Sequence, residues 1–189
     1  MTTETATASD LARLTGDYTL DPAHTRIGSV ARHAMVTKVR GSFADFDGGF
    51  HVDGENPANS SGRLTIRARS IDTGNADRDA HLRSNDFFAM DEYPEITFVS
   101  TAVEPVDAEH HRVTGDLTIR GVTRPVTVDV AFTGAATDPF GNLRVGLEGS
   151  VTVNRKDWGV SWNAALEAGG VLVSEKATLE LDISAIKNA

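Results

Sequence analysis

The chain has 189 residues, a formal net charge of −9 and no cysteine. This length suits one domain with a sizeable core. The lack of cysteine excludes disulfides, thiolate nucleophiles and cysteine-ligated metals, and the acidic charge argues against nucleic acid as a partner. The first residues lack the segments of a secretory leader, and no stretch approaches the roughly 20 apolar residues of a membrane span. We therefore expect a soluble, cytoplasmic protein with no membrane span.

The N-terminal 15 residues are rich in Thr, Ala and Glu, and we predict that residues 1–15 form a disordered or short helical extension. Ser9 and Asp10 would cap a helical turn that Gly16 ends. Residues 16–189 form the predicted domain. Its first part contains a short strand at 18–20 and an extended stretch over 25–39, in which Gly28 or Ala31-Arg32 is expected to mark a bulge or bend.

Alternation of apolar and polar residues predicts further strands through the rest of the chain. The sequence Asp47-Gly48-Gly49 indicates a tight hairpin or a bulge. About eight strands follow one another with hairpin-length connections, so the sheet should be antiparallel. Such strands make either a sandwich or a closed barrel, and a closed barrel has no exposed edges. The predicted strands cover 63–71, 96–103, 113–119, 126–133, 143–153 and 171–183.

One helix interrupts this pattern at residues 76–85, where no Gly, Pro or β-branched residue occurs. Asn75 is the predicted N-cap, Asp77 and Asp79 place negative charge in the first turn, and Arg83 lies in the last turn. In a chain of strands, such an insert is expected to cover an opening.

The predicted barrel interior leaves two alternatives open. Small inward residues, among them Gly115 and Gly149, favour a cavity that holds an apolar ligand. The other alternative is a core filled by aromatic side chains. The lining candidates are Phe43, Leu64, Ile66, Phe87, Phe88, Phe98, Leu117, Val126, Val128, Val130, Phe132, Val145, Leu147, Val151, Trp158, Trp162, Leu179 and Leu181.

Seven stretches in a fixed order carry a resemblance to a known family. They are YTLDPAHT (18–25), RH through GSF (32–43), IDT (71–73), RDAHL with FF (78–88), YPEITFVS (93–100), GDLTIRGVT (115–123) and NRKDWG (154–159). Over roughly residues 16–187 the chain closely resembles the YceI-like family, the lipocalin-like polyisoprenoid-binding proteins. Any one stretch is weakly specific, whereas the ordered set is specific.

The resemblance implies an all-β, eight-stranded antiparallel lipocalin-like barrel, with a short helix covering or flanking its mouth. It also implies a cavity for a polyisoprenoid, an isoprenoid quinone or a fatty-acyl amide. Family members are often dimers, so a homodimer is an expected assembly. Many are exported with a leader, and none is visible in this sequence.

Several polar residues invite a chemical interpretation. His24, His33 and His81, with Asp21 and Asp79, suggest a metal site, but their spacing matches no ligand pattern, and we predict no metal and no cofactor. His81 with Asp77 more simply makes a helix surface pair. The histidines at 110–111 are expected in a solvated turn.

The cluster Arg78-Asp79-x-His81 suggests acid–base chemistry, yet no nucleophile motif or phosphate loop accompanies it. Anchoring of the helix to the barrel rim, or contact with a lipid head group, is the preferred interpretation. We therefore name Arg78, His81 and Arg83 as mouth or head-group candidates.

Glu175 is the fourth mouth candidate. By a period of two it shares the inward face of its strand, and a buried carboxylate would need a partner such as Arg155. The alternative is a bulge that turns Glu175 outward.

The predicted function is a binding protein, with no catalytic residue, that sequesters or carries a long-chain apolar ligand such as an isoprenoid. One rival is a lipid-modifying enzyme on the same barrel, for which Glu175 is the only hint. The other rival is a stress-related structural protein with a filled core.

Overall fold

The computed structural model describes residues 12–189, so the predicted extension falls mostly outside the described residues. The strands are β1 (Gly16–Leu20), β2 (Arg26–His33), β3 (Thr37–Phe43), β4 (Phe46–Val52), β5 (Ser61–Arg67), β6 (Ile71–Asp72), β7 (Glu95–Pro105), β8 (His110–Ile119), β9 (Val122–Thr137), β10 (Leu143–Asn154) and β11 (Val173–Lys187). The α-helix is α2 (Ala76–Arg83), and the short 3-10 turns are η1 (Pro22–His24), η2 (Pro57–Asn59), η3 (Ala68–Ser70) and η4 (Arg155–Trp158).

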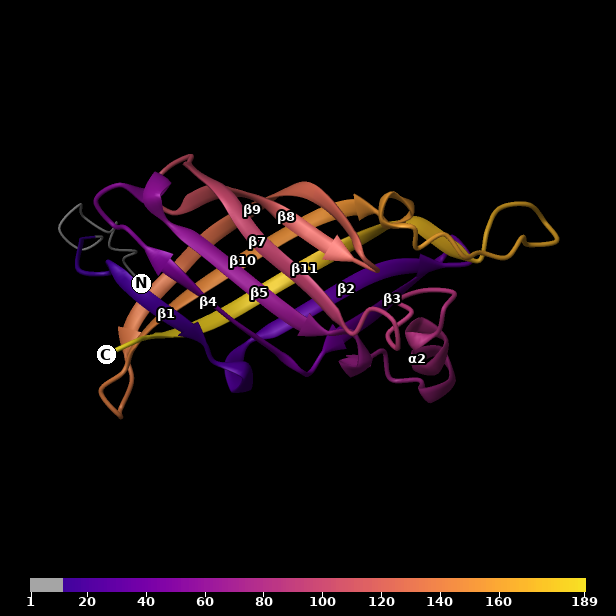
Figure 1. Ribbon diagram of the computed structural model, residues 1–189, viewed down its shortest axis with the longest axis horizontal. Coiled ribbons are helices and arrows are strands. Elements are labelled where there is room, and N and C mark those ends of the chain that lie inside the picture. Colours follow the sequence, from indigo (N-terminus) through magenta and orange to yellow (C-terminus); the bar gives the residue numbers. More distant parts are fainter. Residues whose placement is uncertain (1–11) are drawn as a thin grey trace.

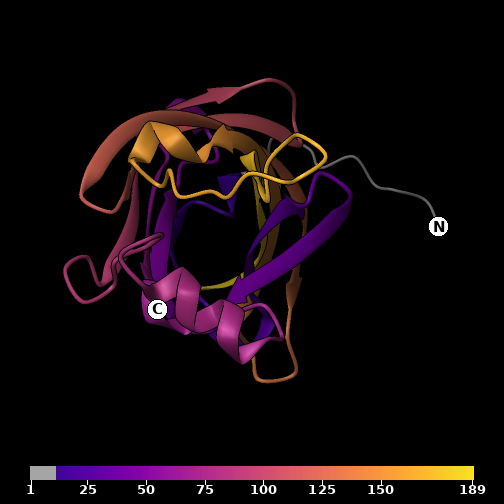
Figure 2. The same ribbon diagram turned by 90° about the vertical axis from the view of Figure 1, so that its right-hand side faces the viewer.

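These segments form an eight-stranded closed antiparallel barrel, which confirms the predicted fold (Figures 1 and 2). Closure follows from β1, which pairs with both β4 and β11. The eleven segments make eight barrel strands, because some of them are parts of one interrupted strand. The turn η1 only interrupts the path from β1 to β2, and a two-residue bend joins β3 to β4. The two-residue β6 continues the path of β5 after η3.

Local sequence explains the β8–β9 turn but not the β2–β3 turn. Arg120 and Gly121 form the β8–β9 turn with φ values of 50° and 72°, a left-handed conformation that glycine adopts readily. The β2–β3 turn contains Ala34 and Met35 at φ 50° and 62° without any glycine. The prediction of one extended stretch over 25–39 was therefore wrong, because the residues of this turn give no turn signal.

The predicted hairpin or bulge at Asp47-Gly48-Gly49 was also wrong, because these residues lie inside β4 and pair with β5 without a register shift. A Cβ at Gly48 would lie 2.6 Å from the carbonyl oxygen of Arg63, and one at Gly49 would lie 2.5 Å from that of Tyr18. Glycine is needed here for close approach of neighbouring strands, not for a turn.

Helix α2 lies against one end of the barrel, which we call the mouth (Figure 2). The side chain of Asn75 accepts a hydrogen bond from the backbone N–H of Arg78, so the predicted N-cap is confirmed. The helix ends at Arg83, two residues earlier than predicted. In the described part of the chain, no helix is long and apolar enough to cross a membrane.

Candidate functional site

The inner surface of β9, β10, β11 and β2 carries apolar or small side chains that are only half-buried. An inward side chain of a closed barrel that keeps accessible surface indicates that the interior is not completely filled. We call this surface the lumen wall. Its residues are Val126, Val130, Phe132, Leu147, Val151, Val153, Leu179, Leu181, Ile183, Ser29 and Ala31.

Strand register places small residues side by side on the lumen wall near the mouth. Leu179 is opposite Ser29, and Ser29 is opposite Gly41 in β3. One step closer to the mouth, Ala31 lies between Ala177 and Val39. Side chains of this size leave space in the interior of an eight-stranded barrel. Ser29 and Ala31 therefore mark the candidate channel, whereas the side chains of Ile71 and Thr73 take the space beside Gly41.

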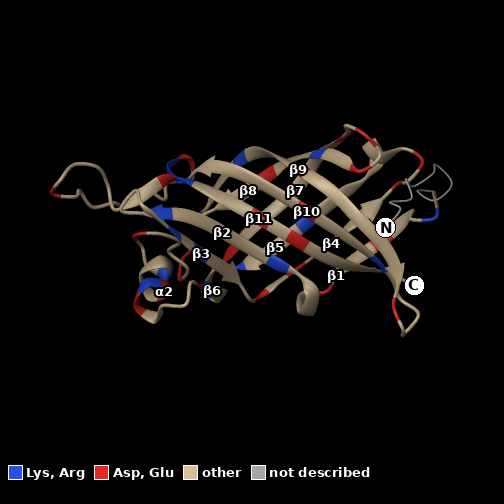
Figure 3. Cartoon of the chain, turned by 180° about the vertical axis from the view of Figure 1, so that it is seen from behind, with Lys and Arg blue, Asp and Glu red and all other residues tan. Residues whose placement is uncertain are grey.

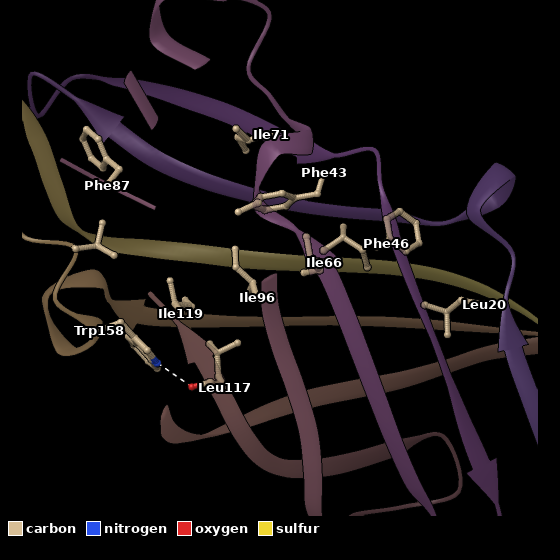
Figure 4. Packing of buried hydrophobic residues seen from close by; sticks show 13 residues of the cluster. Leu20, Phe43, Phe46, Ile66, Ile71, Phe87, Ile96, Leu117, Ile119 and Trp158 are labelled. Carbon is tan, nitrogen blue, oxygen red and sulfur yellow. Dashed lines mark hydrogen bonds between the residues drawn. The ribbon is translucent and has the colours of Figure 1, made fainter. Parts of the chain in front are cut away.

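The opposite wall, on β5, β7 and β8, is packed. Ile66, Ile96, Leu117 and Ile119 are buried there. Figure 4 shows their side chains in one cluster, where the indole N–H of Trp158 donates to the carbonyl of Leu117 at 2.9 Å. This contact fixes η4 against the inside of the barrel near the mouth. Both walls mix the two kinds of side chain, since Leu64 and Phe98 are half-buried on this wall and Ile27 and Val128 are buried on the other.

A second cluster lies at the end of the barrel away from α2. The rings of Tyr18 and Phe50 stack with centroids 5.2 Å apart, and the Tyr18 hydroxyl donates to the carbonyl of Leu14 at 2.8 Å. Val145 and Ala185 are buried in the same cluster. Burial raises the pKa of Tyr18. The interior is therefore packed at this end.

Polar groups anchor α2 to the mouth. Asp79 is buried and accepts hydrogen bonds from the backbone N–H and the hydroxyl of Thr73, at 3.0 and 2.6 Å. The Arg78 guanidinium donates to the hydroxyl and carbonyl oxygens of Thr73 at 2.7 and 2.8 Å. Arg83 donates to the carbonyls of Arg69 and Ile71. These contacts match the anchoring interpretation of the Arg78–His81 cluster.

His81 joins α2 to the segment that follows η4. Its ring meets Trp162 and Phe87 edge-on, with centroids 4.5 and 5.0 Å apart. Its Nε2 lies 2.8 Å from a carboxylate oxygen of Asp86. The predicted surface pair with Asp77 was wrong, because the side chain turns toward the residues beyond the helix end. His81 is the candidate polar group that lies among aromatic rings at the mouth.

Glu175 lies on the outer surface, so the inward alternative was wrong. The β2–β11 register shifts between Val173 and Ala177, and this irregularity turns Glu175 outward. Its carboxylate binds the Lys156 ammonium at 2.6 Å, and this contact lowers the pKa of Glu175. Arg155, the partner that the sequence suggested, is buried instead.

The Arg155 guanidinium donates to three backbone carbonyls, those of Val160, Val173 and Ser174. It also lies over the ring of Phe87, 5.9 Å from the centroid. Burial lowers the pKa of Arg155. Arg155 therefore holds η4 to the irregular start of β11.

The other histidines lie apart. His24 pairs with Asp21 beside η1 at 2.8 Å. His110 and His111 belong to β8 rather than to a turn, and burial lowers the pKa of the half-buried His111. Among residues 12–189, no three His, Asp or Glu side chains are grouped so as to hold a metal ion.

Most of the predicted lining residues point inward, in two groups. Phe43, Ile66, Phe87, Leu117, Val128, Val145 and Trp158 are fully buried, while Leu64, Phe88, Phe98, Val126, Val130, Phe132, Leu147, Val151, Trp162, Leu179 and Leu181 are half-buried. Sequence reasoning missed Ser29, Ala31 and Gly41. These residues occupy every second position of the strands within 26–43, and that spacing was the available signal. Side chains this small do not stand out in a search for apolar residues.

A recess of about 660 Å³ is open and lies over β8 to β11. Outward residues such as Asp129, Glu148, Ser150 and Asp182 line it. Val130 and Leu181 of the lumen wall also line this recess.

Comparison with known proteins gives a consistent result. The family model of the YceI-like domain matches residues 18–185. The UPF0312 protein plu2095 of Photorhabdus laumondii is 42% identical over 147 residues, which are 77% of this chain and 76% of that protein. The UPF0312 protein SAS2572 of Staphylococcus aureus is 39% identical over 165 residues, or 87% of this chain and 94% of that one.

Solved structures share the fold. BcnA of Burkholderia cenocepacia superposes with a TM-score of 0.77 at 24% identity, covering 87% of this chain and 98% of that chain. The YCEI protein of Campylobacter jejuni gives 0.72 at 27% identity, covering 84% and 90%. A domain of Saccharophagus degradans described as polyisoprenoid-binding gives 0.69 at 14% identity, covering 90% and 98%.

Proposed function

The chain belongs to the YceI-like family, and on that premise we propose that its barrel binds a long-chain apolar ligand along the lumen wall. The ligand classes are a polyisoprenoid, an isoprenoid quinone and a fatty-acyl amide. The observation that carries the proposal is the set of half-buried apolar side chains facing the interior of a closed barrel. Accessible apolar surface inside a protein favours an apolar occupant.

The energetics of such a site suit a chain-like ligand. Each buried methylene contributes about 0.8 kcal/mol, so a long chain offsets the free-energy cost of association. One added methylene changes the affinity little. Selection among lipids then depends on channel length and on polar groups at the mouth, where we propose that His81 contacts the polar end of the ligand.

The roles of Arg78 and Arg83 at the mouth are narrower than the sequence suggested. Both guanidiniums donate to backbone carbonyls of residues 69–73. We propose that they set the position of α2 and contact a head group only through their remaining donors.

Binding is proposed in preference to lipid modification because Glu175, the one sequence hint of chemistry in the lumen, lies outside the barrel. A carrier or sequestering role, a cytoplasmic location and a homodimer are further parts of the proposal. A protein with a filled core and no ligand is the remaining rival, and the half-buried lumen wall argues against it.

The test is organic extraction of the purified protein followed by mass spectrometry. We expect an isoprenoid, quinone or acyl chain in a fixed ratio to protein. Extraction that yields no lipid, even after incubation with a total lipid extract, would reject the binding function.

A further inference from the structure

The β2–β3 hairpin is the basic part of an acidic protein. Residues 25–44 contain four Lys or Arg residues and no Asp or Glu, while the whole chain has a net charge of −9. Arg26 and Arg40 share the carboxylate of Glu180, at 3.6 and 3.5 Å. Within residues 12–189, neither Arg32 nor Lys38 has an acidic side chain in ion-pair range.

Arg32 and Lys38 are direct cross-strand neighbours. They share the outer face with Arg40, because Ala31 and Val39, one residue away on each strand, face the lumen. Two like charges directly opposite each other destabilise a strand pair. An anionic surface outside the hairpin would relieve this repulsion.

The end of the same hairpin is apolar. Met35 and Val36 are 60% and 74% exposed. Two hydrogen bonds fix the position of this turn. The N–H of Ala34 donates to the carbonyl of Leu172 at 2.7 Å, and the Arg32 guanidinium donates to the carbonyl of Val36 at 3.0 Å. We call Arg32, Met35, Val36 and Lys38 the basic tip.

The basic tip lies at the mouth. Figure 1 shows the β2–β3 turn beside the segment before β11, at the same end of the barrel as α2. Figure 3 shows the basic residues of the hairpin near this end. The neighbouring segment 162–173 contains one charged residue, Glu167. Exposed apolar side chains flanked by unpaired cations therefore lie next to the opening of the candidate channel.

We propose that the basic tip docks on the surface of an anionic lipid bilayer, with Met35 and Val36 entering the interface and Arg32 and Lys38 on the head groups. Exposed apolar side chains beside cations suit a soft lipid interface better than a protein surface, which would have to supply a matching groove. The choice of a bilayer also rests on the proposed function, because a lipid ligand must come from a membrane. Docking at the mouth would shorten its path into the channel.

The test is flotation of the protein with vesicles of phosphatidylcholine alone and of phosphatidylcholine with one-third phosphatidylglycerol. We expect binding to the anionic vesicles at low salt and its loss at high salt. Lys38→Gln should weaken binding about fivefold, the effect of one cation near such a surface. Met35→Asn should weaken it by about the same factor through lost apolar area, and asparagine suits the left-handed conformation at this position.

Phe140 supplies the matched control. It is 89% exposed in the β9–β10 turn at the opposite end of the barrel, and Phe140→Ser should leave vesicle binding unchanged. Three results would overturn docking through this tip: equal binding to both vesicles, binding to neither, or no effect of Lys38→Gln and Met35→Asn. Binding of an acidic protein at the tip would not change that conclusion. If extraction yields a lipid but the protein does not bind vesicles, only the docking proposal is rejected. If the protein binds vesicles but extraction yields no lipid, only the proposed ligand binding is rejected.

Discussion

The ring of Phe98 fills the space beside Gly115 on the neighbouring strand. A Cβ at Gly115 would lie 2.7 Å from the Cε2 atom of Phe98 and 2.7 Å from the carbonyl oxygen of Val99. Gly115 was one of the small residues expected to leave room for a ligand. Its missing side chain instead admits an aromatic ring, so Gly115 adds no room for a ligand.

This contact predicts that Gly115→Ala is destabilising. Overpacking of a filled interior costs about 1–3 kcal/mol, measured as the free energy of unfolding in urea. The double variant Gly115→Ala, Phe98→Leu should recover only part of the loss, because the carbonyl of Val99 stays in place. Full recovery would mean that the ring alone requires glycine here.

The hydrogen bonds between Asp79 and Thr73 hold α2 on the barrel, so we expect their loss to lower the stability of the protein and of this helix. Asp79→Ala leaves the buried N–H and hydroxyl of Thr73 without their acceptor, at a cost of about 1–3 kcal/mol. Amide hydrogen exchange over residues 76–83 should accelerate in this variant. Asp77→Ala is the control, since Asp77 is exposed in the same helical turn and should change stability by less than about 1 kcal/mol.

The pair of Asp21 and Arg144 predicts a pH dependence. The Arg144 guanidinium, 2.7 Å away, and next His24 lower the pKa of the Asp21 carboxyl from 3.8 to about 2. A carboxyl whose pKa is lower in the folded state stabilises the fold above its unfolded pKa, and this contribution is lost as the pH falls toward the folded pKa.

The urea midpoint should therefore fall between about pH 4 and pH 2. Asp21→Asn should be less stable at pH 5 and should show a shallower decline across this window. The decline should not vanish, because Arg144 also binds Asp138 at 2.8 Å, and hydrogen bonds lower the pKa of that carboxyl as well. Identical slopes in the two proteins would contradict the assignment to Asp21.

His81 gives a prediction about the mouth. His81→Ala should weaken binding of a lipid with a polar head by about fivefold, roughly the contribution of one hydrogen bond. Binding of a hydrocarbon with the same chain length should stay unchanged. A competition assay with a fluorescent fatty acid measures both. Arg78→Ala is expected to lower stability as well, because Arg78 holds Thr73, and so it cannot isolate a head-group effect.

Much of the fold was predictable because strand alternation and the α2 cap are local signals. The β9 to β11 pattern placed Val151 and Leu179 on the inner face, and Asn75 marked the start of α2. Glu175 shows where the local signal ends. Its direction depends on a register shift against β2, which a period of two within one strand cannot reveal.

The shape of the site was less predictable than its composition. The pairing between β11, β2 and β3 places Ser29 in the candidate channel. That pairing required the turn at Ala34 and Met35, which has no glycine or asparagine to indicate it. Without the turn, 25–39 looked like one strand, and the inner face of β2 could not be assigned.

The central claim is that a long chain lies along the lumen wall, and the most direct test is the same substitution on the two faces of the barrel. Ser29 faces the lumen, whereas Ser150 is exposed on the outer face of β10. Binding of a fluorescent long-chain fatty acid should fall at least about tenfold in Ser29→Phe, because the ring occupies the channel. Ser150→Phe should bind like the unaltered protein. Equal affinity in the two variants would place the ligand outside the barrel and contradict the account.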